Sequence, residues 1–296
     1  MFPQRNRIFF VPVAIVLMIL SCDVTAFAKT DSILTIGYRE DAPPFSYETE
    51  EGNPTGYSID ICKEISKEAI NNGLFDRSAF IRVSADSRFK DLHEGKIDLL
   101  CEATTVTIKR IQDFRPSFFT FISGASFMYN PDNGNIRCEE FLSKKIGVLR
   151  GTTTKNEIVD IIKSQCEGLQ KKREVSEAIH LEQLASHQDS INALVNDKID
   201  IYYADRDILL YYRTKARSQN FNLSVSRRYF TNEPYAVFMR LDDNDLHFIA
   251  NKTIVALCRN GEINNIFRRH FTGYLMSQPL KNLYQLLKLL DGPKPL

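Results

Sequence analysis

The alternation of apolar strand-like segments with amphipathic helical segments constrains the fold more than any other feature of the sequence. Residues 33–38 are apolar enough for a strand that ends before Pro43-Pro44, and the apolar positions of 58–72 have the spacing of a helix that stops at Gly73. Further strands are predicted at 80–83, 97–101, 117–128, 145–149, 199–203 and 235–239, and further helices at 88–94, 155–163, 190–196, 205–213, 244–258 and 262–271. Strands that alternate with helices form mainly parallel sheets covered on both faces, so we expect an α/β fold.

Two stretches of the chain resemble each other at an offset of 102 residues. The matching positions are Ser87, Leu92 and Lys96-Ile97-Asp98 in the first stretch and Asp189, Leu194 and Lys198-Ile199-Asp200 in the second. Two interpretations stay open: units that end alike by chance, or two lobes of similar βα construction. In the second case the loops at 103–105 and 203–205 follow equivalent strands. Because ligands gather at the carboxyl ends of strands, two such edges facing each other would form a cleft.

The composition excludes several classes of protein. With 296 residues, 43% of them hydrophobic, the chain can bury the core of one large or two small domains. Lys plus Arg total 38 against 37 Asp plus Glu, and this balance argues against nucleic acid as a partner, since phosphate binding draws on clustered excess cations. The five histidines lack metal-ligand spacing, and no glycine-rich phosphate or dinucleotide motif occurs, so we expect neither metal nor cofactor.

The first 28 residues have the pattern of a secretory signal peptide. Arg5 and Arg7 precede an apolar run at 8–20, which is too short to span a bilayer comfortably, and a polar stretch ends at Ala26-Phe27-Ala28. We therefore predict cleavage after Ala28 and an exported mature protein. Two alternatives stay open: a lipoprotein box at 19–22, in which Cys22 becomes the acylated N-terminus, and uncleaved anchoring.

Export changes how the cysteines are interpreted, because an oxidising compartment permits disulfides. Cys62 and Cys101 fall in apolar patterns, so we expect both to be buried free thiols. Cys138 and Cys166 flank a strand and a helix, and a disulfide between them is a hypothesis, since spacing alone does not fix connectivity. No two cysteines have the spacing of a zinc site or of a thioredoxin-like pair.

Cations and hydroxyl residues lie at the ends of several predicted elements. They are Arg39, Arg88, Thr104-Thr105, Arg110 and Gly151-Thr152-Thr153-Thr154. A single arginine is most often a solvated surface charge, and a threonine at a helix start is often an N-cap, as Asp205 would be for the helix after it. A glycine followed by hydroxyl residues at a helix start also presents free N–H groups to an anion.

No catalytic motif stands out in the sequence. His187, Asp189 and Ser190 contain the residue types of a catalytic triad, but they lie within one short segment, and no oxyanion hole is signalled. Helix capping by Asp189 or Ser190 is the favoured interpretation. We therefore expect no catalytic residues.

Several segments, taken in order, resemble family 3 periplasmic solute-binding proteins, which feed polar amino acids to ABC importers, and above all their glutamate/aspartate-binding members. The segments are Ile36-Gly37-Tyr38-Arg39-Glu40-Asp41, Pro44-Phe45-Ser46-Tyr47, Gly56-Tyr57-Ser58-Ile59-Asp60-Ile61, 98–105, 147–153, 187–190, Asp205, 260–271 and the tail at 279–283. The resemblance covers nearly the whole mature chain. Ser58 departs from it, since the family usually has an acid at that position.

The resemblance implies a bilobal periplasmic binding protein-like fold of type II, with two βα lobes joined by two hinge strands. Lobe 1 would comprise 32–129 plus 232–272, and lobe 2 would comprise 130–231. Residues 273–296 would form a C-terminal extension. A Cys138–Cys166 disulfide would then lie within lobe 2.

The resemblance also implies ligand-binding roles. Arg110 would hold the ligand α-carboxylate with Thr105 and Thr153, and Asp205 would pair with the α-ammonium beside the carbonyl of Ala103. Arg39, Arg88 and His187 match positions that face the side-chain carboxylate in the acidic amino acid binders. Thr104 and Thr152 complete the expected site. Ala85 and Ala103 depart from the pattern, because relatives commonly have serine there.

We therefore expect an extracytoplasmic, periplasmic binding protein that is a monomer. It would capture a polar amino acid, above all an acidic one, and deliver it to the membrane permease of an ABC importer. Because Arg39, Arg88 and a protonated His187 would lack a counter-charge around a neutral side chain, glutamate or aspartate should bind at least tenfold better than glutamine or asparagine, which is ~1.4 kcal/mol. Two alternatives are an exported enzyme on the same fold, similar to cyclohexadienyl dehydratase, with Glu102 as its acid or base, and a sensor ectodomain.

Overall fold

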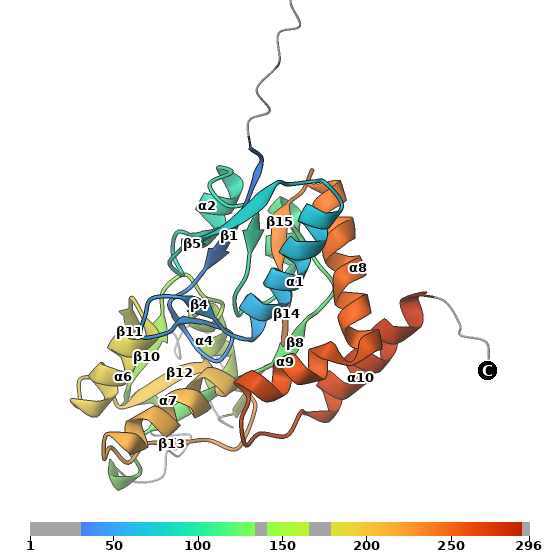
Figure 1. Cartoon of the computed structure of the whole chain (residues 1–296). Coiled ribbons are helices and arrows are strands. Elements are labelled where there is room, and N and C mark those ends of the chain that lie inside the picture. Colours follow the sequence, from blue (N-terminus) through green and yellow to red (C-terminus); the bar gives the residue numbers. More distant parts are fainter. Residues whose placement is uncertain (1–30, 134–140, 166–178, 292–296) are drawn as a thin grey trace, which may run out of the picture. The chain divides into compact units, whose positions relative to one another are not determined.

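Two five-stranded sheets form the framework of the protein (Figure 1). The computed structural model describes residues 31–133, 141–165 and 179–291. The predicted signal peptide, Cys22, Cys138 and Cys166 lie outside the described residues. Among the residues that are described, no helix is long and apolar enough to cross a membrane.

The first sheet, with the helices packed on it, is called the first lobe. Its strand order is β5 (Arg77–Arg82), β1 (Ile33–Tyr38), β6 (Leu99–Leu100), β15 (Phe238–Arg240) and β7 (Phe114–Pro116). Strand β1 runs parallel to β5 and β6, whereas β15 runs antiparallel to both of its neighbours. The sheet is therefore mixed, and its parallel part places the loop after β1 beside the loop after β6.

The second sheet has a similar construction and defines the second lobe. Its strand order is β11 (His180–Leu184), β10 (Lys145–Leu149), β12 (Ile201–Asp205), β9 (Ala125–Tyr129) and β13 (Ser224–Val225). Strand β10 runs parallel to β11 and β12, and β9 runs antiparallel to β12 and β13. Because β9 pairs in this sheet, the chain enters the second lobe before Ala125, and the expected boundary at residue 129 is too late.

Two short strands join the lobes. Strand β8 (Phe121–Ser123) pairs antiparallel with β14 (Glu233–Tyr235), with Phe121 opposite Tyr235 and Ser123 opposite Glu233. One strand precedes β9 and the other precedes β15, so the chain crosses from one sheet to the other along each of them. This pair corresponds to the two hinge strands implied by the resemblance.

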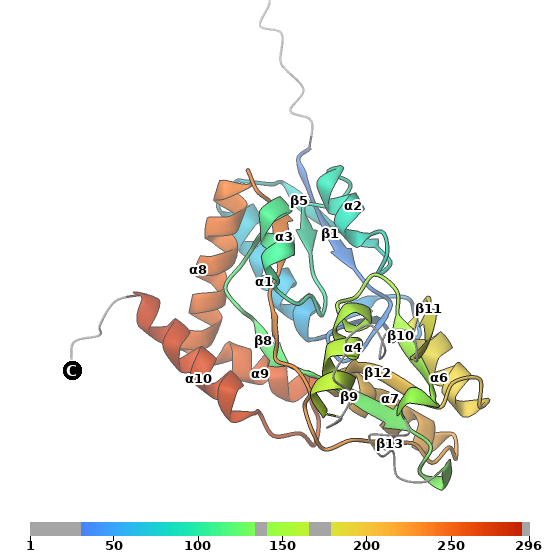
Figure 2. The same cartoon turned by 180° about the vertical axis from the view of Figure 1, so that it is seen from behind.

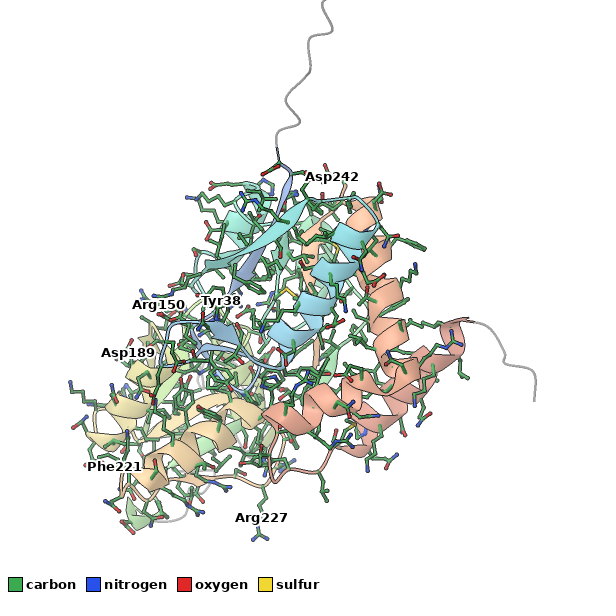
Figure 3. The ribbon with its side chains drawn as sticks, in the orientation of Figure 1. Tyr38, Arg150, Asp189, Phe221, Arg227 and Asp242 are labelled. Atoms are coloured by element: carbon green, nitrogen blue, oxygen red, sulfur yellow. A yellow bond between two sulfur atoms is a disulfide. The ribbon has the colours of Figure 1, made fainter. Side chains whose placement is uncertain are left out.

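Helices cover both sheets (Figures 1 and 2). The first lobe contains α1 (Tyr57–Asn71), α2 (Arg88–His93), α3 (Ile108–Asp113), α8 (Asn244–Asn260), α9 (Glu262–His270), α10 (Gln278–Leu287) and the 3₁₀ turn η3 (Lys288–Asp291). The second lobe contains η1 (Pro131–Asn133), α4 (Thr154–Gln165), α6 (His187–Val195) and α7 (Arg206–Ser218). A small sheet of β2 (Asp41–Ala42), β3 (Ser46–Glu48) and β4 (Pro54–Thr55) precedes α1. Exposed charges such as Asp242 and Arg227 point away from the two lobes (Figure 3).

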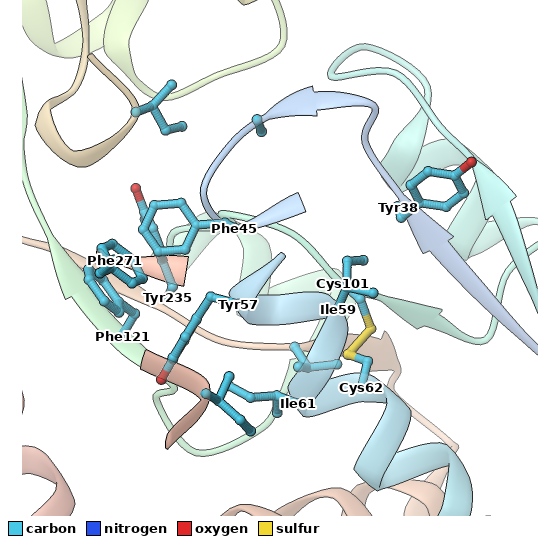
Figure 4. Packing of buried hydrophobic residues seen from close by; sticks show 14 of the residues in the cluster. Tyr38, Phe45, Tyr57, Ile59, Ile61, Cys62, Cys101, Phe121, Tyr235 and Phe271 are labelled. Carbon is cyan, nitrogen blue, oxygen red and sulfur yellow. A yellow bond between two sulfur atoms is a disulfide. The ribbon is translucent and has the colours of Figure 1, made fainter. Parts of the chain in front are cut away.

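The core of the first lobe corrects one prediction about the cysteines. Cys62 and Cys101 form a disulfide and are not free thiols (Figure 4). Cys62 lies on the buried face of α1, and Cys101 directly follows β6, which brings their Cα atoms to 6.3 Å, within the range that a disulfide spans. The apolar surroundings predicted burial correctly but carried no information about pairing. Among the described residues, Cys258 is a buried free thiol.

The described part of the C-terminal extension, residues 273–291, packs onto the first lobe. Ser277 caps α10 by accepting a hydrogen bond from the N–H of Leu280, and Leu280, Tyr284 and Leu287 are buried along one face of the helix. The Tyr284 hydroxyl donates to the carbonyl of Thr120 at 2.9 Å and also contacts the hydroxyl of Tyr57. The extension therefore stabilises the start of strand β8.

Candidate functional site

Loops and helix ends of both lobes enclose a cavity. Nine of the ten predicted site residues line it, together with Leu149, Thr154, Ala204 and Ile208; the nine are Arg39, Arg88, Ala103, Thr105, Arg110, Thr152, Thr153, His187 and Asp205. Thr104 is the exception, because its side chain is buried behind the cavity and donates a hydrogen bond to Glu102 at 2.7 Å. Nine of the ten residues predicted from the sequence therefore lie together around one cavity, and Thr104 contacts Glu102 outside the cavity lining.

Arg110 comes from the first lobe and is held firmly. The Thr107 hydroxyl accepts from the N–H of Arg110 at 3.2 Å and caps α3. The guanidinium donates to the carbonyl of Thr105 at 2.6 Å and lies over the ring of Phe89, 4.8 Å from its centre. These contacts orient Arg110 while leaving further N–H donors of its guanidinium for the cavity.

The loop 151–153, which precedes α4, brings the second lobe against the first. Gly151 has a φ of 70°, and a Cβ at this residue would lie 2.3 Å from the carbonyl oxygen of Ala85. The Gly151 carbonyl accepts a hydrogen bond from Arg88 at 3.0 Å. The Thr152 hydroxyl donates to the carbonyl of Leu149 at 2.7 Å. The close approach of the lobes at this loop requires glycine.

Arg39 and Arg88 do not lack a counter-charge, so the premise of the predicted acidic preference is wrong. Arg39 binds the carboxylate of Asp41 through Nη2 at 2.5 Å and Nε at 3.1 Å. The carboxylate of Glu102 lies 2.9 Å from Nε of Arg88 and 3.7 Å from Nε of Arg39. All four side chains are buried or nearly so, and each arginine has a carboxylate partner within the protein.

His187 is not a cation in this site. Its ring Nδ1 is hydrogen bonded to the hydroxyl of Tyr202 at 2.6 Å, and burial beside the Arg39 guanidinium lowers the pKa of the imidazole to about 3. Its backbone N–H donates to Asp41 of the first lobe at 2.7 Å. The imidazole is therefore neutral at physiological pH.

The local contacts of α6 exclude a triad and correct the predicted cap. The Ser190 hydroxyl donates to the carbonyl of Ser186 at 2.9 Å and does not bond His187. Ser186, and neither Asp189 nor Ser190, is the N-cap, and its hydroxyl accepts from the N–H of Asp189 at 3.0 Å. The segment builds a helix start and carries no nucleophile.

Carboxyl groups cluster at the Asp205 end of the cavity. Asp205 precedes α7 without capping it through its side chain, which lines the cavity instead. Burial and the neighbouring Glu233 raise the pKa of Asp205 well above its usual range, and the same two causes raise the pKa of Glu157 to about 7. Crowded carboxyl groups of this kind are suited to a cationic group, which would relieve their repulsion.

Sequence reasoning missed four acidic residues of this site: Asp41, Glu157 and Glu233, and also Glu102 in its role as an ion-pair partner. The segments around Asp41 and Glu102 were noted for other reasons, but nothing local indicates that either carboxylate turns toward an arginine. Glu157 lies on a helix and Glu233 on a hinge strand. Only the packing of the two lobes brings them near Asp205.

Comparison with known proteins gives a consistent result. Residues 34–273 match the model of the bacterial extracellular solute-binding proteins, family 3. The chain is 24% identical over 269 residues to the glutamate/aspartate import solute-binding protein of Escherichia coli (strain K12), covering 90% of this chain and 84% of that protein. It is 23% identical over 250 residues to an ABC transporter glutamine-binding protein of Bacillus subtilis (strain 168), covering 83% and 84%. Among solved structures, an ancestral arginine-binding protein bound to glutamine has a TM-score of 0.70 at 22% identity, covering 82% of this chain and 99% of that one.

Proposed function

The chain belongs to family 3 of the bacterial extracellular solute-binding proteins, and from this membership we propose that it is a periplasmic amino acid-binding protein that serves an ABC importer. The fold agrees, since two βα lobes joined by two strands are the architecture of the type II binding proteins. The ligand enters between the lobes, and contacts made only when they meet stabilise the closed form. A membrane permease then receives the ligand.

One observation carries the proposal: a guanidinium and a carboxylate from opposite lobes line the same cavity. Arg110 of the first lobe presents a fork of N–H donors that fits an α-carboxylate, and Thr105 and Thr153 lie beside it. Asp205 of the second lobe fits the α-ammonium, which also relieves the repulsion among Asp205, Glu157 and Glu233. A zwitterionic amino acid thus bridges the lobes, with its α-carboxylate bound by the first lobe and its α-ammonium bound by the second.

The preference for glutamate or aspartate that we expected from the sequence is supported by the relatives but not by the charges in the cavity. Relatives that bind glutamate and aspartate support it by name, and Arg39, Arg88 and His187 all line the cavity. The electrostatic argument for this preference no longer holds, because Arg39 and Arg88 are each paired with a carboxylate and the His187 imidazole is neutral. We therefore propose a polar amino acid and argue the side-chain class separately below.

The structure gives Glu102 no access to a substrate, which removes the candidate acid or base of the enzymatic alternative. Glu102 was the acid or base that a dehydratase-like reaction would use, but its side chain is fully buried and bound to Arg88 and Thr104. A general acid or base must come within hydrogen-bond reach of the substrate, and Glu102 does not line the cavity. A sensor role would use the same cavity with another partner.

A thermal-shift screen of the twenty amino acids tests the proposal, because a ligand at 100 times its Kd adds about 2.7 kcal/mol to stability. We expect at least one polar amino acid to raise the Tm. Arg110→Ala should then weaken every amino acid that binds by at least tenfold, since all share the α-carboxylate. Lys109→Ala, one residue away on the exposed side of α3, is the matched control. Retained affinity in Arg110→Ala would contradict the anchor role.

A further inference from the structure

We propose that Glu102 is a specificity-determining residue. Its carboxylate neutralises the arginines that would otherwise bind the side-chain carboxylate of a ligand. The cavity therefore selects amino acids with a neutral polar side chain. This inference rests on the proposed function and names its substrate class. It reverses the preference expected from the sequence.

Glu102 is held in place from several directions. Cys101, the residue before it, is bound to α1 by the disulfide, and the Ser58 hydroxyl donates to the carbonyl of Glu102 at 3.1 Å. Its side chain has no exposed surface, and its Oε1 accepts from Thr104 at 2.7 Å. Rotation of this carboxylate away from the arginines would therefore break buried contacts, and a ligand carboxylate cannot simply displace it.

The charges at this end of the cavity balance without a ligand. Arg39 and Arg88 contribute two positive charges, and Asp41 and Glu102 contribute two negative charges. A glutamate or aspartate side chain would bring a third carboxylate into a buried cluster next to Glu102. Burying an unpaired charge is strongly unfavourable, whereas a neutral side chain leaves the balance intact.

A hydrogen-bond donor left over in the cluster matches the oxygen of a carboxamide. Arg88 lines the cavity and is almost fully buried, and its Nη1 has no hydrogen-bond partner among the described residues. A carboxamide offers a neutral oxygen to such a donor and adds no charge to the balanced cluster. Glutamine and asparagine are therefore the ligands that we expect.

Calorimetry with four amino acids tests the inference. In the wild-type chain, glutamine or asparagine should bind at least tenfold more tightly than glutamate or aspartate, a difference of about 1.4 kcal/mol. Glu102→Gln removes the internal carboxylate at nearly constant size, so this variant should invert the preference by at least tenfold. Glu48→Gln is the matched control, because Glu48 pairs with Arg82 at 2.6 Å and does not line the cavity. It should leave the ratio unchanged.

A second variant keeps the test decisive if Glu102→Gln fails to fold with Arg88 unpaired. The double change Arg88→Gln and Glu102→Gln removes one charge of each sign, so it should keep the preference for neutral side chains. Wild-type protein that binds glutamate as tightly as glutamine would overturn the inference while leaving the proposed function intact. The inference would also fall if the double variant preferred glutamate. Absence of binding by any amino acid would overturn the proposed function and the inference with it.

Discussion

His187 lies in a position where protonation opposes folding. The ring is buried, bonded to Tyr202 and close to the Arg39 guanidinium, and its pKa is lowered from 6.5 to about 3. Between these two pH values the unfolded chain binds a proton at this residue that the folded chain does not. Stability from His187 is therefore fully present above pH 6.5 and is lost as the pH falls toward 3.

We expect His187 alone to lower the free energy of unfolding by about 2 kcal/mol between pH 8 and pH 5. Denaturant titrations at both pH values on the wild type and on His187→Gln measure this contribution as the difference between the two changes. Glu157, whose pKa is raised to about 7, gives a dependence of the opposite sign, but it is present in both proteins and cancels. Equal changes in the two proteins would contradict the assignment of a neutral, buried imidazole.

At the scale of residues, the sequence predicted which side chains surround the cavity better than it predicted their charge state. Arg39, Arg88 and Arg110 were identified because each lies near the end of a predicted element. Asp41 and Glu102 were not identified as the ion-pair partners of Arg39 and Arg88, because a local pattern does not show which way a carboxylate turns after a strand. The premise of the acidic preference was wrong at this point, since it counted cations and omitted the carboxylates packed against them. The preference itself stays a prediction.

The disulfide between α1 and the residue after β6 is the main covalent constraint that the structure shows among the described residues. Cys62 and Cys101 are 39 residues apart in sequence, and closing a loop of this length in the unfolded chain stabilises the folded state by about 4 kcal/mol on the chain-entropy model. Replacing both residues by alanine should lower the free energy of unfolding by about this amount. Denaturant titration under non-reducing conditions measures it.

Cys258→Ala is the control for the disulfide variant, because it removes a buried sulfur without removing a cross-link. The double alanine variant should unfold at a clearly lower denaturant concentration than Cys258→Ala does. If the two unfold together, the cross-link contributes nothing beyond the packing of its sulfur atoms.

At the scale of elements, periodicity located the long helices and the buried strands well. Helix α1 and strand β10 begin and end within one residue of their predicted bounds, because their apolar faces pack directly on neighbouring elements. Strand β11 was missed, since its five residues are mostly exposed at the edge of the second sheet and show no alternation. The prediction of mainly parallel sheets missed strands β15 and β9, each of which runs antiparallel to both of its neighbours.

Closure of the whole molecule depends on Gly151. A methyl group at this residue would lie 2.3 Å from the carbonyl oxygen of Ala85 in the opposite lobe. Gly151→Ala should therefore hold the lobes apart and weaken ligand binding at least tenfold. Calorimetry with whichever amino acid binds the wild type measures the loss, and small-angle scattering should show a smaller ligand-induced compaction.

Gly52 offers a matched control for Gly151. Both glycines have a positive φ, 78° at Gly52 and 70° at Gly151, so alanine strains the backbone at either position, by roughly 1 kcal/mol. A Cβ at Gly52 meets nothing within 4 Å. Gly52→Ala should lower stability without changing affinity, and equal affinity in both variants would show that the contact with Ala85 does not limit closure.

The position of β15 in the first sheet has a consequence for the order in which the chain folds. Strand β15 lies between β6 and β7, so the first sheet stays in two pieces until residue 240 has been synthesised. The second sheet needs only residues 125–225, one continuous stretch. Domains fold as units as the chain emerges, N-terminus first. The second lobe, which begins later in the sequence, is therefore complete before the first lobe. The lobe that carries Arg39, Arg88 and Arg110 therefore acquires its final form last, after nearly the whole chain has been made.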